Sequence, residues 1–438
     1  REARRSLADA LLNDRFQTEK CDFDYIKSTS WFNLEKHSSS DTSVVFGEID
    51  DPVNKAISIK VSLKPKNLLN DNSLVIEQLN YKHVVNSLIE YKFTPHLIAY
   101  IGSFMCNNSQ LKRNLPTDVY EHIVDDLFPD NKKPNSQQKY SFLVTEKAQN
   151  AKELEDWLWN VDKKKERFPS SENTPNLLQI KSVLFQVLYN FAVFNRIGFR
   201  HNDAHLGNIF VEDKSGTDIF EKTAYVLDGD VYIFPTKRNF TKMYDFDRSG
   251  VNCNLQTDND LTNEILDAYD KDAHKYAETD NCTNRIFYFD FIDNLGAGSE
   301  PNERYDTCLT LLWMYWKMQQ KLDKYDGKVI PTHIIEYFEL WKDEILPFIY
   351  KHMKHVISIS AEGDEEYEDT GGAEGYKPTY WIKGDLNMST PLEMIQDSFF
   401  NVGKQNETWT ELFERKVTGL DSRIVKTMLY PTYTLPTP

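Results

Sequence analysis

Apolar and polar residues alternate strictly over 56–63, and this period of two predicts a strand with one buried face. The apolar members of the alternation are Ile57, Ile59, Val61 and Leu63. A helical stretch follows and runs to about residue 91, and 97–104 and 140–145 are again typical of strands. The polar stretch 107–139 carries three prolines and is expected to be an inserted loop. The first third of the chain is therefore predicted to be a sheet with one helix.

In the middle of the chain, apolar residues recur with the period of an α-helix. A long helix is predicted to begin with Thr174 as N-cap and Pro175 at its first position. Its apolar residues recur at helical spacing: Ile180, Leu184, Val187, Leu188 and Phe191. Asp228-Gly229 predicts the tight turn of a hairpin, and a second apolar helix spans about 306–320. The chain thus changes from strand-rich to mainly helical.

Length and composition indicate a globular protein of two lobes or two domains with extensions. The 438 residues exceed what one hydrophobic core supports, and 40% hydrophobic with 13% aromatic residues is enough to build a packed core. The net charge of −17 argues against binding to nucleic acid or to an anionic membrane.

The cysteines and the absence of targeting signals favour an intracellular, cytoplasmic protein. The five cysteines are widely spaced, odd in number and form no CxxC: Cys21, Cys106, Cys253, Cys282 and Cys308. This pattern favours neither a disulfide framework nor a structural zinc site. It is instead typical of a protein in a reducing compartment. No apolar run of about 20 residues is apparent, so no membrane span is expected. The chain starts at Arg1 without a signal pattern, which suggests a processed or trimmed fragment.

Two short segments carry the chemistry. The first is the run 201–208, His-Asn-Asp-Ala-His-Leu-Gly-Asn, and the second is 244–247, Tyr-Asp-Phe-Asp. Phosphoryl transfer needs a carboxylate to orient the attacking hydroxyl, oxygen ligands for magnesium, and positive charge near the phosphates. Asp203 and Asn208, five positions apart on one loop, and the later Asp245 can supply the oxygen groups.

These segments resemble the protein-kinase superfamily, whose catalytic loop reads H-R-D-x-x-x-x-N and is followed by D-F-G. The resemblance implies that Asp203 is the catalytic base and that Asn208 and Asp245 bind Mg²⁺. It also implies that His201 is structural, and that Asp306, at the start of the second apolar helix, supports the catalytic loop from beneath.

The strand-rich part of the chain then resembles the small lobe of a kinase. Ile-Ser-Ile-Lys at 57–60 occupies the place of the family's V-A-I-K, which implies that Lys60 binds the ATP phosphates. Glu77 shares an apolar stripe of the following helix, and an inward carboxylate needs a cation, so a Lys60–Glu77 pair is expected. Glu146 and Lys147 resemble the link between the lobes, whose backbone would hold adenine.

The sequence departs from the family pattern in four respects. The phosphate-covering loop has Ser38, Ser40 and Ser43 where the family has glycine. Asn202 replaces the arginine of the catalytic loop, and Asp247 replaces the glycine of D-F-G. No A-P-E motif precedes the second apolar helix. The His-x-Asp-x-His and Asp-Phe-Asp patterns also resemble aminoglycoside and choline kinases, and the hairpin insertion and serine-rich loop resemble the kinase-like proteins of large DNA viruses.

The resemblance predicts an α+β, bilobal protein-kinase-like fold, with a small β-rich N-lobe with one key helix and a larger, mainly helical C-lobe. The expected divisions are an N-terminal extension (1–29), the N-lobe (30–147), the C-lobe (148–358), an acidic disordered loop (359–378), and a helical segment packed on the C-lobe (379–438).

Simpler interpretations accompany each of these residues. His201, Asp203 and His205 could together bind a metal, Lys64 rivals Lys60 as the phosphate lysine, and Glu77 could pair with Lys82 or face solvent.

The favoured function is an ATP- and Mg²⁺-dependent serine/threonine protein kinase acting on a protein substrate, in the cytoplasm or, if viral, in the virion. The alternatives are a catalytically weak kinase-like scaffold, which the glycine-free loop favours, and a small-molecule kinase, which Asp247 favours.

Overall fold

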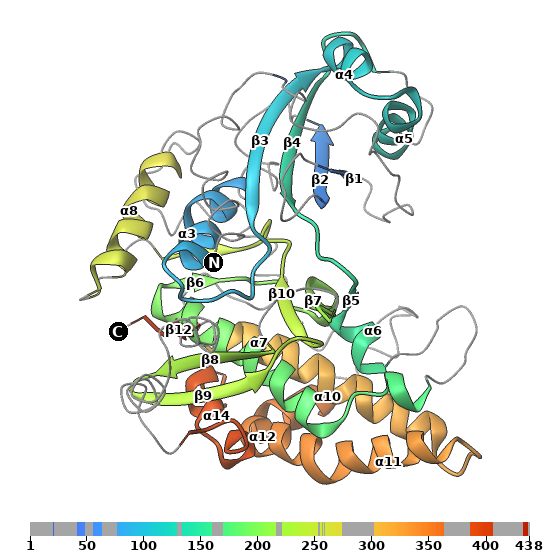
Figure 1. Cartoon of the computed structure of the whole chain (residues 1–438), viewed down its shortest axis with the longest axis vertical. Coiled ribbons are helices and arrows are strands. Elements are labelled where there is room, and N and C mark those ends of the chain that lie inside the picture. The colour runs from blue at the N-terminus through green and yellow to red at the C-terminus, as the bar shows by residue number, and fades with distance from the viewer. Residues whose placement is uncertain are drawn as a thin grey trace, which may run out of the picture.

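The computed structural model describes residues 21, 42–48, 56–63, 77–128, 134–159, 170–215, 221–252, 255, 257, 259–273, 302–362, 386–405 and 432–436. They form a small lobe built on strands and a larger lobe that is mainly helical (Figure 1). The predicted α+β fold with two lobes is confirmed. Most of the predicted N-terminal extension and of the acidic loop lies outside the described residues.

The small lobe contains a four-stranded antiparallel sheet in the order β1-β2-β4-β3. Its strands are β1 (Thr42–Glu48), β2 (Ala56–Leu63), β3 (Tyr100–Asn107) and β4 (Lys139–Glu146). The predicted alternation is present in β2, where Ile57, Ile59 and Val61 are fully buried. Because successive side chains of a strand point to opposite faces, Lys60 lies on the other face of the sheet.

The expectation of a loop over 107–139 is wrong for most of this stretch, because two helices form there. They are α4 (Asn108–Asn114) and α5 (Thr117–Leu127). Asn107 and Gln110 form a reciprocal capping box that starts α4. Helix α5 buries Val119, Ile123 and Leu127 at a spacing of four residues, against the same face of the sheet as Ile57 and Ile59. This period of four is the sequence signal that outweighs the prolines.

The predicted helix of the small lobe covers the other face of the sheet. It is helical from Glu77 and continues through a π-helical turn, η2 (Asn80–Val85), into α3 (Asn86–Glu90). On its outer side lies α8 (Asp260–Ala273), as Figure 1 shows. Helix α8 buries Ile265, Leu266 and Tyr269, and the Tyr269 ring meets the His83 ring of η2 edge-on.

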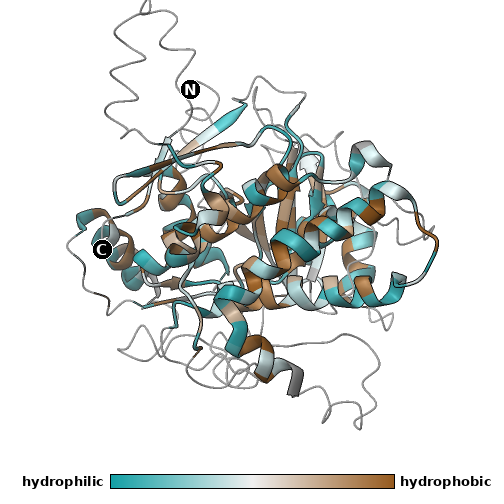
Figure 2. Ribbon diagram, turned by 90° about the horizontal axis from the view of Figure 1, so that it is seen from below, coloured by the Kyte–Doolittle hydropathy of each residue, from teal (hydrophilic) through white to brown (hydrophobic). Residues whose placement is uncertain are grey.

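The larger lobe is organised around α7 (Leu177–Arg196), whose middle is buried. Its N-cap is Asn176, which forms a capping box with Gln179, and not the predicted Thr174. Among the described residues, α7 is long and apolar enough to cross a membrane by length and composition, which corrects the expectation that no such run exists. Its side chains are mostly buried inside the lobe, as in the core helix of a globular protein. Figure 2 shows apolar residues gathered in the middle of the molecule.

The remaining elements surround this helix. The helical ones are α6 (Leu154–Trp159), η3 (Ser171–Asn173), η4 (Leu206–Asn208), α10 (Tyr305–Tyr325), α11 (Thr332–Leu340), η6 (Trp341–Ile345), α12 (Leu346–Glu362), α14 (Pro391–Ile395) and η9 (Ser398–Phe400). The short strands are β5 (Ala151–Glu153), β6 (Phe199–Arg200), β7 (Ile209–Glu212), β10 (Phe240–Met243) and β11 (Gly250–Val251). Strands β10, β7 and β5 form one small sheet, and β11 and β6 form another.

The predicted hairpin is present as β8 (Lys222–Leu227) and β9 (Asp230–Pro235). Asp228 and Gly229 both adopt positive φ, of 47° and 97°, as the tight turn requires. The strand β12 (Thr432–Thr434) pairs in parallel with β8, so the end of the chain returns to this hairpin.

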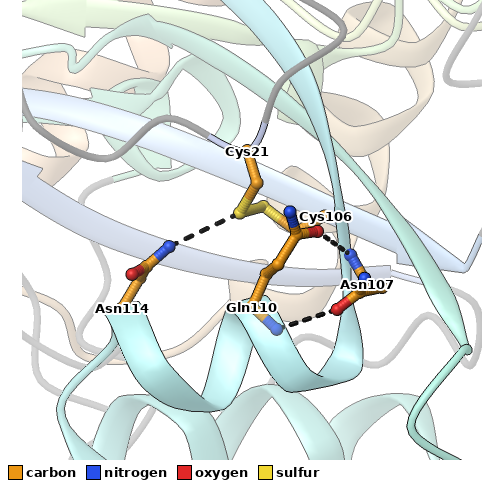
Figure 3. The surroundings of a disulfide bond; sticks show 5 residues. All are labelled: Cys21, Cys106, Asn107, Gln110 and Asn114. Carbon is orange, nitrogen blue, oxygen red and sulfur yellow. Dashed lines mark hydrogen bonds between the residues drawn. A yellow bond between two sulfur atoms is a disulfide. The ribbon is translucent and has the colours of Figure 1, made fainter.

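A disulfide between Cys21 and Cys106 corrects the expectation drawn from cysteine spacing (Figure 3). The two residues are 85 positions apart, with a Cα–Cα distance of 4.7 Å. Cys106 lies at the end of β3 beside α4, and Asn114 of α4 donates to the Cys21 sulfur. No local motif marks the pair because the fold alone brings Cys21 beside β3. Cysteine usage therefore no longer supports a reducing compartment.

Asp397 links the segment that carries α14 and η9 to α12 through hydrogen bonds. Its Oδ2 accepts hydrogen bonds from Lys351 and from His352 Nε2 at 3.1 Å, and its Oδ1 accepts from the Phe399 amide at 2.8 Å. Although burial opposes the charge, the contact with Lys351 and the Phe399 amide lower the pKa of Asp397 to about 2. The ionised carboxylate is therefore the stabilising form.

Asp397→Asn is expected to lower the free energy of unfolding by about 1 kcal/mol at pH 6. A depressed folded-state pKa contributes stability that is present above the unfolded value near 4 and is lost as the pH falls toward 2. The difference between the variant and wild type should therefore shrink by pH 2.5 in urea denaturation. A difference independent of pH would contradict an ionised Asp397.

Candidate active site

The loop 201–208 connects β6 to β7 and is held from below by α10. Asp306, in the first turn of α10, accepts hydrogen bonds from the amides of His201 (2.7 Å) and Asn202 (2.8 Å). Burial raises the pKa of Asp306, and His201 and these backbone donors oppose the rise. Asn202 adopts a positive φ of 65°, and its Nδ2 donates to the Arg248 carbonyl at 2.7 Å. The loop is thus fixed at its base before it reaches Asp203.

His201 joins this loop to the segment that carries Asp245. Its Nδ1 lies 3.3 Å from the Asp203 amide, which donates to it, and its Nε2 lies 2.9 Å from the Tyr244 carbonyl. Burial lowers the pKa of His201, so the neutral ring with its proton on Nε2 satisfies both contacts. With both nitrogens occupied, His201 is not placed to bind a metal together with Asp203 and His205.

Asp203 and Asn208 lie side by side. Asn208 Nδ2 donates to the Asp203 carbonyl at 2.9 Å and lies 3.4 Å from its Oδ2. Arg248 Nη1 donates to the same Oδ2 at 2.9 Å. Burial raises the pKa of Asp203, while His205 and Arg248 oppose the rise. Arg248 was not predicted from the sequence, because the family pattern ends one residue before it.

Phe246 anchors the segment 245–247 in the core. It is fully buried and meets the Tyr81 ring edge-on at 5.0 Å and the His201 ring at 4.8 Å. Asn80 Nδ2 donates to the Phe246 carbonyl at 2.9 Å, which ties the segment to η2. Asp245 has a positive φ of 65°. Asp245 and Asp247 are the neighbours of Phe246 in the chain, so the buried Phe246 ring helps to fix the positions of both residues.

Lys60 joins the two lobes at this point. Its Nζ lies 2.8 Å from Glu77 Oε2, 2.7 Å from Asp245 Oδ1 and 4.0 Å from Asp247 Oδ2. The structure thus brings Lys60 together with Glu77 and with Asp245, while Lys64 lies outside the described residues. The Lys60 side chain is 20% exposed, so a ligand can still reach it.

The charges in this cluster are strongly coupled. Burial opposes the charge of Lys60, but Asp245 and Glu77 together raise the pKa of Lys60 well above its usual value. Burial raises the pKa of Glu77 to about 8 and that of Asp247 to about 6. Asp245 is also buried, yet Lys60 holds its pKa below the usual value, so Asp245 is the ionised member. A further cation at this cluster would favour the ionised forms of Glu77 and Asp247, which burial disfavours.

The oxygen atoms around this cluster fit magnesium, which prefers carboxylates and substrate phosphates. Asp247 Oδ1 is buried without a hydrogen-bond partner among the described residues. Over the same residues, no group of three or more His, Cys, Asp or Glu side chains is placed to hold a metal ion by itself. Asp245 and Asn208, with Asp247 beside them, would hold the ion only together with phosphate oxygens and water.

The link between the lobes is held by hydrogen bonds of its backbone amides. The Glu146 amide donates to the Ala99 carbonyl at 2.9 Å, and the Lys147 amide donates to the Ala56 carbonyl at 3.1 Å. The Glu146 carboxylate is buried in an ion pair with Lys242 of β10 and also accepts from the Ala99 amide at 3.0 Å. Both amides are thus already hydrogen-bonded within the protein, and adenine binding by the backbone of this link stays a prediction. The Glu146–Lys242 pair could not be foreseen, because β10 is 96 residues further along the chain.

The structure does not bring Ser43 to this cluster. Ser43 pairs across the sheet with Val61, and its hydroxyl donates to Asp126 of α5 at 2.8 Å, on the face opposite Lys60. Ser38 and Ser40 lie outside the described residues.

Comparisons with known proteins were made by family model, by sequence and by structure. No family model matches the chain, and no curated protein matches it. Among solved structures, a MAP kinase from Leishmania major is similar over 92% of this chain and 88% of that chain, at 12% identity and a TM-score of 0.32. A second kinase domain is similar over 89% of this chain and 100% of that chain, at 12% identity and a TM-score of 0.32. These similarities are too low to indicate a function, so the function has to be argued from the side chains of the site.

Proposed function

We propose that this protein is an ATP- and magnesium-dependent phosphotransferase that transfers the γ-phosphoryl group to a hydroxyl, and that its substrate is a serine or threonine of a protein. The observation that carries the proposal is Lys60, whose Nζ lies within 2.8 Å of both Glu77 and Asp245. Lys60 thus puts a positive charge beside the segment of the larger lobe that carries Asp245, as a phosphate-binding site requires.

Each residue would act through its charge and position. Lys60, held by Glu77, would bind the ATP phosphates, and magnesium at Asp245 and Asn208 would neutralise charge on them. Asp203 would accept a hydrogen bond from the substrate hydroxyl and orient it for in-line attack. The hydroxyl oxygen bonds to the γ-phosphorus as the bond to the bridging oxygen breaks, and the hydroxyl proton passes to Asp203.

A small-molecule hydroxyl is the second candidate substrate. Asp247 favours it, because this carboxylate lies 4.0 Å from Lys60 and adds negative charge to the cleft, as would suit a cationic alcohol. A panel of protein substrates, choline and aminoglycosides with labelled ATP separates the two classes.

Asp203→Ala is expected to lower phosphotransfer by about 10²-fold or more, because the hydroxyl loses its orienting base. The assay follows labelled phosphate transfer by the purified full chain with ATP and magnesium. Asp323→Asn, on the exposed side of α10, is the matched control and should leave turnover unchanged. Equal activity of wild type and Asp203→Ala would indicate a contaminating kinase and would favour a scaffold.

A further inference from the structure

Arg248 contacts the loop 201–208 through both its side chain and its backbone. Its guanidinium Nη1 donates to Asp203 Oδ2 at 2.9 Å, and its carbonyl accepts from Asn202 Nδ2 at 2.7 Å. The side chain remains 35% exposed, so a ligand can reach it. Arginine stays charged at every working pH, and its planar fork can donate to a carboxylate and a phosphate together.

Among the described residues, the contacts given for the Asp203 carboxylate fall on one oxygen, Oδ2. Oδ2 accepts from Arg248, lies 3.4 Å from Asn208 Nδ2, and lies 3.9 Å from His205 Nε2. The other oxygen, Oδ1, is therefore the one presented to a substrate hydroxyl. Arg248 fixes which oxygen meets the substrate.

Arg248 also lies within reach of the group that would be transferred. A hydroxyl bound to Asp203 lies about 3 Å from its carboxylate, and the phosphorus it attacks lies about 3–3.5 Å further on. A guanidinium in contact with the same carboxylate is therefore next to the phosphoryl oxygens. The ion pairs of Lys60 Nζ among the described residues are with Glu77, Asp245 and Asp247, so Lys60 would meet the phosphates at a different place from Arg248.

We propose that Arg248 is a catalytic residue that holds Asp203 through Oδ2 and donates to the transferred phosphoryl group as its bond to ATP breaks. The inference rests on the proposed function and adds to it a second cation, on the side of the acceptor. It also accounts for an arginine directly after Asp247, where its charge offsets three neighbouring carboxylates, Asp203, Asp245 and Asp247.

Kinetics of the full chain test this role. Arg248→Gln is expected to lower kcat by about 10²-fold and to leave the KM for ATP within about threefold, because the contact forms only during transfer. Arg248→Lys should restore part of kcat. Arg196→Gln, which breaks the distant pair with Asp228, is the control and should match wild type. A kcat of Arg248→Gln within threefold of wild type overturns the inference and leaves the proposed function standing.

Binding of a transition-state mimic separates contact with phosphate from support of Asp203. Calorimetry with magnesium should show that Arg248→Gln weakens binding of ADP–aluminium fluoride at least tenfold more than binding of ADP. Equal weakening of the two would assign Arg248 a structural role and overturn the inference. A wild-type chain without turnover would instead overturn the proposed function, and the inference with it.

Discussion

Asp245→Asn is expected to reduce phosphotransfer by at least about 10²-fold and to raise the magnesium concentration needed for half-maximal rate. The amide keeps the shape of the side chain but loses the charge that attracts both Lys60, 2.7 Å away, and a divalent ion. Initial rates measured over a series of magnesium concentrations at saturating ATP report both effects.

The matched control for this change is again Asp323→Asn, which makes the same substitution on an exposed helix. If Asp245→Asn lowered the rate but kept the wild-type dependence on magnesium, Asp245 would position Lys60 without binding the ion. If it changed neither, the phosphate site would have to lie elsewhere.

Lys60→Met is expected to abolish measurable turnover and to lower the free energy of unfolding by about 3 kcal/mol at pH 8. It leaves Glu77, Asp245 and Asp247 without the cation that all three face, and an uncompensated buried charge is costly. Urea denaturation of the purified variant at several pH values measures the loss.

The pH dependence of this loss has a defined sign. The raised pKa of Lys60 means that its charge stabilises the fold at every pH below the unfolded value near 10.4, and that this contribution is lost as the pH rises through the folded value. Without Lys60, whose charge lowers the pKa of Glu77, that carboxyl is mostly protonated already at pH 8. Protonation of Asp247 toward pH 5 removes further uncompensated charge, so the loss should be smaller at pH 5 than at pH 8. Lys317→Met, which removes a surface pair with Glu155, should cost less than about 1 kcal/mol at either pH.

The parts of this site that follow local patterns could be predicted from the sequence. The alternation over 56–63 determines which face Lys60 takes, and Glu77 belongs to the next helix, only 17 residues away. The spacing of Asp203 and Asn208 fits a single loop, whose geometry the structure describes. Whether these residues perform the predicted roles stays a prediction for the variants above.

The parts that depend on long-range pairing could not be predicted. Ser43 turns away from Lys60 because the register of β1 on β2 sets it opposite Val61. Glu146 reaches Lys242, and Arg248 reaches Asp203, across segments whose relative placement no local pattern encodes. The Cys21–Cys106 disulfide has the same origin.

The position of α8 has a consequence for how the Lys60–Glu77 pair could be controlled from outside. The helix that carries Glu77 is enclosed on its outer side by Leu266 and Tyr269 of the same chain. A regulator that acts on η2 from the side covered by α8 would have to displace α8, and this would expose Leu266 and Tyr269 to water. The resting arrangement of the pair is therefore supplied within one polypeptide, and loosening α8 is the physical route to switching it off.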